Sequence, residues 1–226
     1  MELTADNIHK RYGPFTALDR VSFEIASGER ICLLGPNGSG KTTLLRILSG
    51  LSRPTDGSAR VGGAEIRPDD PAVRERIGFV SHSTMVYEGL TARENLRFHA
   101  RLWNVEQDRV SEVLEAVGLA DRGSGLPREF SHGMGKRLAL ARALLDPSPV
   151  LLLDEPFSGL DQASTDTVVG LLEDRTVLLA THDFDRAFEH CDRVFVLDRG
   201  RMALESSLSA FDSRDDLRNR YQEVVE

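Results

Sequence analysis

"GPNGSGKTT", residues 35–43, is a glycine-rich stretch between an apolar run and a segment with helical spacing. The pattern fits G-x-x-x-x-G-K-[ST], in which glycines let backbone N–H groups surround phosphate oxygens at a helix N-terminus. Lys41 is predicted to reach the β- and γ-phosphates of a nucleotide, and the Thr42 hydroxyl to bind Mg²⁺. The residues predicted to contact the nucleotide are Gly35, Pro36, Asn37, Gly38, Ser39, Gly40, Lys41, Thr42 and Thr43.

A second phosphate-site element is the apolar run "LLLDEP", residues 151–156, which is typical of a buried parallel strand. Asp154 is predicted to hold Mg²⁺ through water, and Glu155 to orient or deprotonate an attacking water molecule. Two acids could instead only cap the strand. The phosphate loop favours the catalytic interpretation, because we expect its strand to lie beside the Asp154 strand.

The length, composition and net charge of the chain exclude some classes of protein. The chain has 226 residues, 40% of them hydrophobic, and a formal net charge of −8. This suits one globular unit, or a core with a subdomain, and argues against a nucleic-acid binder with a broad basic surface. No apolar run approaches the ~18 residues of a membrane span, and the N-terminus lacks the apolar region of a signal peptide. Work at a membrane would therefore require docking on another chain.

Strands and helices alternate through most of the chain, which predicts an α/β core with a parallel sheet. Three consecutive helical patterns predict a separate helical lobe at residues 83–147, the first opening with a capping box from Thr91 to Glu94. The core is then residues 1–82 and 148–200, and the tail 201–226 is helical near its end. Cys32 and Cys191 lie in strand-like settings and are predicted to be packed thiols.

Three further motifs follow a recognisable order: "FSHGM" at 130–134, "FSGLD" at 157–161 and "THD" at 181–183. This order resembles the nucleotide-binding subunits of ABC transporters over nearly the whole chain. The resemblance implies one P-loop NTPase domain of the RecA-like class, with a parallel-sheet core, an antiparallel β subdomain and a helical signature subdomain. It also implies ATP hydrolysis with Mg²⁺ by an ATP-dependent homodimer, bound to transmembrane permease subunits at the cytoplasmic face of the cell membrane.

"FSHGM" stands where the family carries its signature, usually L-S-G-G-Q. Ser131 is predicted to be the N-cap of the third helix. The resemblance places Ser131 and Gly133 against the γ-phosphate of ATP bound to the other subunit, an anion site at a helix N-terminus. His132 and Met134 depart from the family pattern, so that His132 either crowds the partner's nucleotide or donates a hydrogen bond to it. An ordinary helix cap is the structural alternative.

Three more residues match positions with family roles. Tyr12 matches the aromatic residue that stacks on adenine, and His182 matches the histidine that contacts the γ-phosphate. Asp161 matches the loop that lies across the dimer from the phosphate loop. For Tyr12 and His182 the alternative is a packing role.

A second departure falls at "GFVSHST", where the family carries a glutamine that contacts Mg²⁺ and water. His82 is the matching residue and is predicted to take this metal-binding and catalytic role. Neutral imidazole can accept from water or bind metal, whereas imidazolium cannot. We therefore predict that ATPase activity falls between pH 7 and 6, and that the profile of His82→Gln is flatter than that of the wild type. The alternative is that Ser81 or Ser83 reaches the site.

The stretch "SHSTMVYEGLTARENLRFHARLW", residues 81–103, is similar to the ATP-binding subunit of the haem exporter of cytochrome c maturation. Exporters of drugs, polysaccharides or lipids share "LTARENL". His99 and Trp103 are interpreted not as haem ligands but as residues that either pack within the helical lobe or face the membrane partner, and residues 85–90 as the segment that meets that partner. A soluble ABC ATPase of translation or DNA repair would carry two such domains or a long coiled coil, and a small-molecule kinase would not explain "FSHGM" or "THD".

Overall fold

The computed structural model describes residues 2–68, 70–80, 86–157, 159–172 and 174–225. The chain divides into two compact units. Unit 1 comprises Met1–Ile77, Pro149–Asp154 and Arg175–Glu226, and unit 2 comprises Gly78–Ser148 and Glu155–Asp174. Both units are therefore built from segments that are far apart in the sequence.

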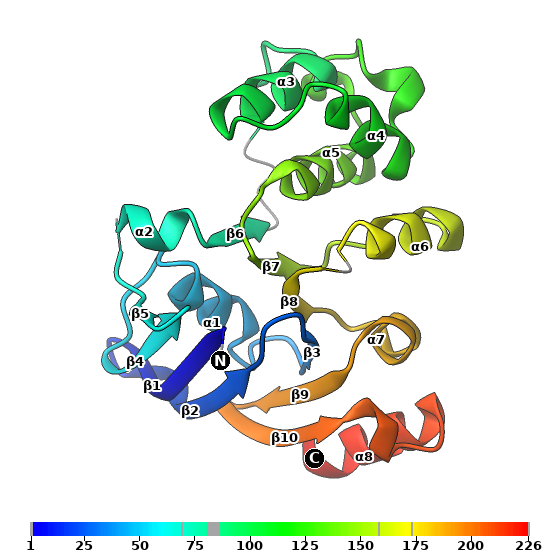
Figure 1. Ribbon diagram of the computed structural model, residues 1–226. Helices are drawn as coiled ribbons and strands as arrows, with labels where there is room; N and C mark the ends of the chain where they lie inside the picture. The colour runs from blue at the N-terminus through cyan, green and yellow to red at the C-terminus, as the bar shows by residue number, and fades with distance from the viewer. Residues whose placement is uncertain (1, 69, 81–85, 158, 173, 226) are drawn as a thin grey trace. The chain divides into compact units, whose positions relative to one another are not determined.

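A six-stranded sheet has the order β10-β9-β3-β8-β7-β6 (Figure 1). Its strands are β3 (Arg30–Leu34), β6 (Ile77–Val80), β7 (Val150–Asp154), β8 (Thr176–Ala180), β9 (Arg193–Asp198) and β10 (Arg201–Ser207). Strands β7, β8, β3 and β9 are parallel, whereas β10 pairs with β9 in the antiparallel sense. The expectation that the Asp154 strand lies beside the phosphate-loop strand was wrong, because β8 lies between β7 and β3.

A four-stranded antiparallel sheet, β2-β1-β4-β5, confirms the expected antiparallel β subdomain. Its strands are β1 (Leu3–Tyr12), β2 (Phe15–Ile25), β4 (Asp56–Val61) and β5 (Ala64–Glu65). The β1–β2 hairpin closes at the pair Tyr12 and Phe15. The Asp19 amide of β2 donates to the Gly200 carbonyl, 2.8 Å away, which ties this sheet to the turn between β9 and β10.

The helices of unit 1 are α1 (Lys41–Leu48), α2 (Pro71–Arg74), α7 (Phe184–His190) and α8 (Arg214–Val225), with the 3₁₀ turn η3 (Leu208–Ala210). Helix α1 buries Leu44, Leu45, Ile47 and Leu48, the apolar stripe that its spacing predicts. Cys32 is buried on β3 as expected. Cys191 is not on a strand, because it is the C-cap residue of α7, and neither cysteine forms a disulfide.

The helices of unit 2 are α3 (Ala92–Leu102), α4 (Arg109–Ala116), α5 (His132–Leu145) and α6 (Gln162–Gly170), with turns η1 (Ala120–Arg122) and η2 (Pro127–Glu129). Helices α3, α4 and α5 pack on one another (Figure 1). The predicted capping box is present, since Thr91 and Glu94 satisfy each other's backbone amides at the start of α3. Among the described residues, no helix combines the length and the apolar character needed to cross a membrane.

Candidate nucleotide site

The phosphate loop connects the end of β3 to the first turn of α1. The Lys41 ammonium donates to the carbonyls of Gly35, 2.6 Å away, and Pro36, 3.1 Å away. These bonds hold the cation over its own loop, where an anion would meet both the ammonium group and the helix N-terminus. The local geometry is therefore that of an anion cradle, as the motif predicts.

Strand β2 and the β9–β10 turn contact the backbone of this loop. Gly40 has a φ of 109°, and a Cβ atom there would lie 2.7 Å from the Ala17 carbonyl oxygen of β2. The Gly200 amide donates to the Ser39 carbonyl at 2.9 Å, and the Ser39 side chain is buried. Only glycine fits at position 40, since a side chain would meet both backbone strain and the β2 backbone.

Thr42 and Asp154 meet beneath the loop, in unit 1. The Thr42 hydroxyl donates to the Asp154 carboxylate over 3.2 Å, and Asp154 is 6% exposed at the end of β7. A hydroxyl and a carboxylate offer the hard oxygen ligands that suit Mg²⁺, either directly or through its water shell. The residues present therefore fit the predicted metal.

The carboxyl ends of three parallel strands meet at this edge of the sheet. Asp154 of β7 and Leu33 of β3 both pair with Ala180, the last residue of β8. His182 follows β8 after the buried Thr181 and is itself exposed. The fold thus gathers the phosphate loop, Asp154 and His182 at one sheet edge, the usual ligand position in parallel α/β sheets.

Glu155 has an unusual backbone. Its φ is 53°, a left-handed conformation that is uncommon for a residue with a side chain, and Pro156 follows it. Such strain recurs at functional sites, where the surrounding structure must hold it. Glu155 is also the first residue of its segment in unit 2, directly after Asp154 of unit 1.

A second group of predicted residues lies within unit 2. Ser131 is the N-cap of α5, as expected, and its hydroxyl accepts from the Met134 amide at 3.3 Å. A Cβ atom on Gly159 would lie 3.8 Å from the Gly133 Cα, so Gly159 of the "FSGLD" stretch lies against the start of α5.

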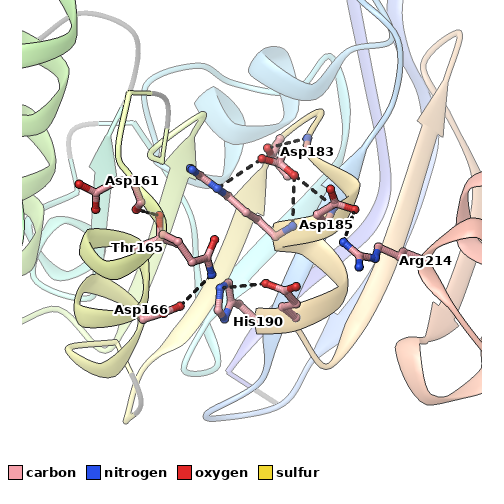
Figure 2. Close-up of polar contacts among 11 residues, drawn as sticks. Asp161, Thr165, Asp166, Asp183, Asp185, His190 and Arg214 are labelled. Atoms are coloured by element: carbon pink, nitrogen blue, oxygen red, sulfur yellow. Dashed lines mark hydrogen bonds and ion pairs between the residues drawn. The ribbon is translucent and has the colours of Figure 1, made fainter.

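Asp161 ends that loop as the N-cap of α6. Its carboxylate accepts from the Ser164 amide at 2.8 Å. Its backbone carbonyl accepts from the Thr165 hydroxyl at 2.9 Å, as Figure 2 shows. The hydrogen bonds from Ser164 lower the pKa of the Asp161 carboxyl below its usual value. The side chain is therefore an anionic cap at neutral pH.

Tyr12 closes the β1–β2 hairpin, and the residue is 49% exposed. The Lys10 ammonium lies 5.0 Å from the ring centroid, a cation–π contact. Phe15, which the sequence argument did not single out, is paired with Tyr12 in the register and is 61% exposed. No pattern in the sequence identifies Phe15, because its exposure depends on how the folded hairpin is placed. His82 lies outside the described residues.

Residues 18–158, which hold both the phosphate loop and Asp154, match the ABC transporter family. The chain belongs to this family. A dimeric ATP-binding cassette solved in a post-hydrolysis state with ADP and Pi matches this fold with a TM-score of 0.81 at 28% identity, over 91% of this chain and 98% of that one. The ABC ATPase fold predicted from the motifs is thereby confirmed, and the enzymatic class is ATP hydrolase.

Curated ABC relatives differ in what they transport. The chain is 37% identical to "Probable sulfate/thiosulfate import ATP-binding protein CysA" of Chlorella vulgaris, over 89% of both chains. It is 40% identical to "Daunorubicin resistance ATP-binding protein DrrA3" of Streptomyces coeruleorubidus, over 91% of this chain and 68% of that one. Several longer sulfate/thiosulfate import relatives are spanned over 57–63% of their lengths. Importers and drug-resistance proteins are thus similarly close to this ABC chain.

Proposed function

We propose that this chain is the nucleotide-binding subunit of an ABC transporter, in which two copies bind ATP and energise separate membrane subunits. The observation that carries this proposal is the Thr42–Asp154 contact beside the phosphate loop, in a chain that belongs to the ABC family. The subunit sits at the cytoplasmic face of the cell membrane as a peripheral protein. Dimerisation is supported by the dimeric cassette that shares the fold.

Residues of unit 1 bind the nucleotide in this proposal. Tyr12 stacks on adenine, the phosphate loop surrounds the β- and γ-phosphates, and Lys41 turns from its loop carbonyls to them. Thr42 and Asp154 hold Mg²⁺, which neutralises charge on the phosphate oxygens when it is bound. His182 contacts the γ-phosphate from the end of β8. These roles are supported by the common sheet edge that the three strands provide.

Hydrolysis requires an oriented water molecule. Its oxygen forms a bond to the γ-phosphorus while the bond from that phosphorus to the bridging oxygen breaks, and the electron pair stays on ADP. Glu155 accepts the proton of the attacking water. Ser131 and Gly133 of the second copy complete the site from the start of α5, and Asp161 holds the adjoining loop.

An apolar surface in unit 2 supports docking on a membrane partner. Phe98 and Leu102 of α3 are 43% and 66% exposed, and Tyr87 packs edge-on against Phe98 at 5.2 Å between ring centroids. Phe98 and Leu102 line one hollow together with Arg97 and Arg101. Exposed aromatic and aliphatic side chains rimmed by arginines are typical of protein interfaces. Tyr87 belongs to the predicted docking segment, of which residues 86–90 are described, so this segment adjoins the apolar surface of α3.

The cargo proposed is haem, on the similarity of residues 81–103 to the exporter of cytochrome c maturation. Drug export is the second candidate, because a daunorubicin-resistance protein is 40% identical to this chain.

The experiment that tests the cargo is a pull-down: the tagged chain is purified from native membranes in mild detergent, and the proteins that co-purify with it are identified. Membrane subunits of cytochrome c maturation would support haem export, and an unrelated permease would overturn it. Recovery of no membrane protein would overturn the transporter role.

A further inference from the structure

The segment that carries His182 is short and is fixed from two sides. Strand β8 ends at Ala180, and α7 starts at Phe184, so His182 lies between them. Asp183 caps α7 by accepting from the amides of Asp185 and Arg186, and its own amide donates to the Thr181 hydroxyl (Figure 2). A seven-residue helix is too short to be stable alone, so its position depends on what packs against it.

The C-terminal helix α8 supplies that packing. The Arg214 guanidinium reaches the Asp185 carboxylate over 3.1 Å (Figure 2). The Tyr221 ring meets the Phe184 ring edge-on, 5.0 Å between centroids, and the Arg218 guanidinium lies 5.4 Å from the Phe184 centroid. Three side chains of α8 therefore hold the first two residues of α7.

Beneath these contacts, α8 enters an apolar cluster. Leu217 of α8 is fully buried with Ala187 of α7, and Phe184 and Tyr221 pack against the same cluster. Leu34 is also a member, and it directly precedes the phosphate loop. Burial raises the pKa of the Tyr221 hydroxyl, which agrees with a ring partly enclosed by this cluster.

We propose that α8 is a positioning element for the ATPase reaction: it holds the start of α7 through Tyr221 and Arg214, and thereby fixes His182. Tyr221 and Arg214 touch neither substrate nor the reacting atoms and act through α7. The inference rests on the proposed role of His182 at the γ-phosphate. It predicts that changes in α8 alter the rate of hydrolysis and leave ATP affinity unchanged, because the phosphate loop keeps its own contacts with β2 and the β9–β10 turn.

The test compares Tyr221→Ala and Arg214→Ala with two controls in the full chain. Tyr221→Phe keeps the ring, and Arg220→Ala removes an arginine of the same helix that pairs only with Glu223 among the contacts the structure describes. Three quantities are measured: the Kd for MgATP by calorimetry, phosphate release per bound nucleotide, and the imidazole NMR signals of the six histidines. The His182 signal is assigned with His182→Gln, and His132 of unit 2 serves as the reference.

Loss of the Tyr221 ring is expected to lower kcat about three- to tenfold, the size of one aromatic pair, with Kd within about twofold. The His182 signal shifts or broadens, whereas the His132 signal does not. Arg214→Ala is expected to show the same pattern with kcat lowered only about twofold, because an exposed ion pair contributes little to stability. Both controls behave as the wild type. Arg214→Ala also keeps the test valid if Tyr221→Ala does not fold.

Two results would overturn the positioning role while leaving the proposed function intact. One is an unchanged His182 signal and kcat in both α8 variants, although the wild type binds and hydrolyses ATP. The other is a Kd for MgATP that rises in step with the loss of rate, since α8 would then act through Leu34 and the phosphate loop. A wild-type chain that binds no MgATP would overturn the proposed function, and this inference with it.

Discussion

Thr42 and Asp154 are separated by 112 positions in sequence, yet their side chains share a hydrogen bond of 3.2 Å. We predict that Thr42→Ala lowers ATP hydrolysis by about tenfold or more, because one hard oxygen ligand of Mg²⁺ is lost. Thr42→Ser keeps the hydroxyl and is the matched control, with activity within about threefold of wild type. Phosphate release is measured across a Mg²⁺ titration. Equal activity in Thr42→Ala and Thr42→Ser would remove the hydroxyl from the metal site.

His99 is a buried histidine whose pKa departs clearly from its usual value. It is 9% exposed, it packs 5.0 Å from the Trp103 ring and 5.4 Å from the Phe98 ring, and neither ring nitrogen has a described hydrogen-bond partner. Its pKa is lowered to about 4, mainly by burial and also by the Arg142 charge, while Asp146 opposes the shift. His99 is thus neutral in the folded chain at physiological pH.

This burial predicts a pH-dependent stability. Between pH 6.5 and 4 the unfolded chain binds a proton at His99 that the folded chain does not, so the free energy of unfolding falls as pH falls. The loss is about 2 kcal/mol at pH 5 relative to pH 7.5. His99→Phe keeps an aromatic ring and is expected to lose this part of the dependence, measured by urea unfolding at both pH values. His132→Asn, at an exposed site, should retain it, and the same slope in His99→Phe would contradict the assignment.

Local chemistry was predictable from the sequence where a motif encodes it. The phosphate loop, the Thr91 capping box and the Ser131 cap each depend on residues within a few positions of one another. Phe15 and the apolar surroundings of His99 were not, since exposure and burial depend on segments that meet only in the fold. The burial of His99 agrees with the packing alternative for this residue, but the lack of described hydrogen-bond partners at its ring nitrogens could not be read from spacing.

At the scale of the elements, the buried side-chain amide of Asn95 joins the start of α3 to the segment before it. Asn95 is 1% exposed, and its side chain donates to the carbonyls of Tyr87, Leu90 and Thr91 and accepts from the Tyr87 amide. These four bonds fix residues 87–91 to the first turn of the helix. The segment proposed to meet the membrane partner is therefore anchored by a residue that faces inward.

We predict that Asn95→Ala destabilises the chain by about 2–3 kcal/mol, because it leaves buried backbone groups without partners. Gln107→Ala removes an exposed amide and should change stability by less than about 0.5 kcal/mol. The comparison is made by urea unfolding at pH 7.5. Should the two variants be equally stable, the amide of Asn95 would not be what fixes the segment.

The order of the strands could not be predicted as well as the strands themselves. The run that became β7 was recognised by its apolar character, which β8 and β9 share, since parallel strands are buried on both faces. Their lateral order was not, because β8 comes later in sequence than β7 and still inserts between β7 and β3. Strand β10 has an alternating pattern of burial with exposed charges, and the charged tail gave no expectation of a strand there.

At the scale of the whole molecule, the residues proposed to bind the nucleotide and those proposed to form the signature belong to different units. The phosphate loop, Asp154 and His182 belong to unit 1, whereas Ser131, Gly133 and Asp161 belong to unit 2. The helical patterns predicted a lobe at residues 83–147, but the residues 155–174 that also cluster with unit 2 gave no such signal. Such an assignment depends on long-range contacts rather than on local pattern. The division is what the proposed two-copy site requires, because each copy contributes both kinds of residue.

That arrangement predicts an ATP-dependent dimer. Glu155→Gln removes the proposed proton acceptor and keeps the side-chain size, so it should slow hydrolysis by about 100-fold or more and trap the bound state. With ATP and Mg²⁺ this variant is expected to elute at twice the 25.0 kDa monomer mass in size-exclusion chromatography with light scattering, and as a monomer without ATP. Lys41→Ala in the same background should abolish both ATP binding and dimerisation.

A variant of Ser131 tests whether the proposed signature faces the nucleotide of the partner copy. Ser131→Arg in the Glu155→Gln background places a bulky side chain where the partner's γ-phosphate is proposed to lie. ATP should still bind with an affinity within about threefold, because the phosphate loop of the same copy is untouched, while the dimer is lost. A Ser131→Arg chain that still dimerises with ATP would show that the signature does not face the partner's nucleotide. Loss of ATP binding with loss of the dimer would instead indicate that Ser131 serves the nucleotide of its own copy.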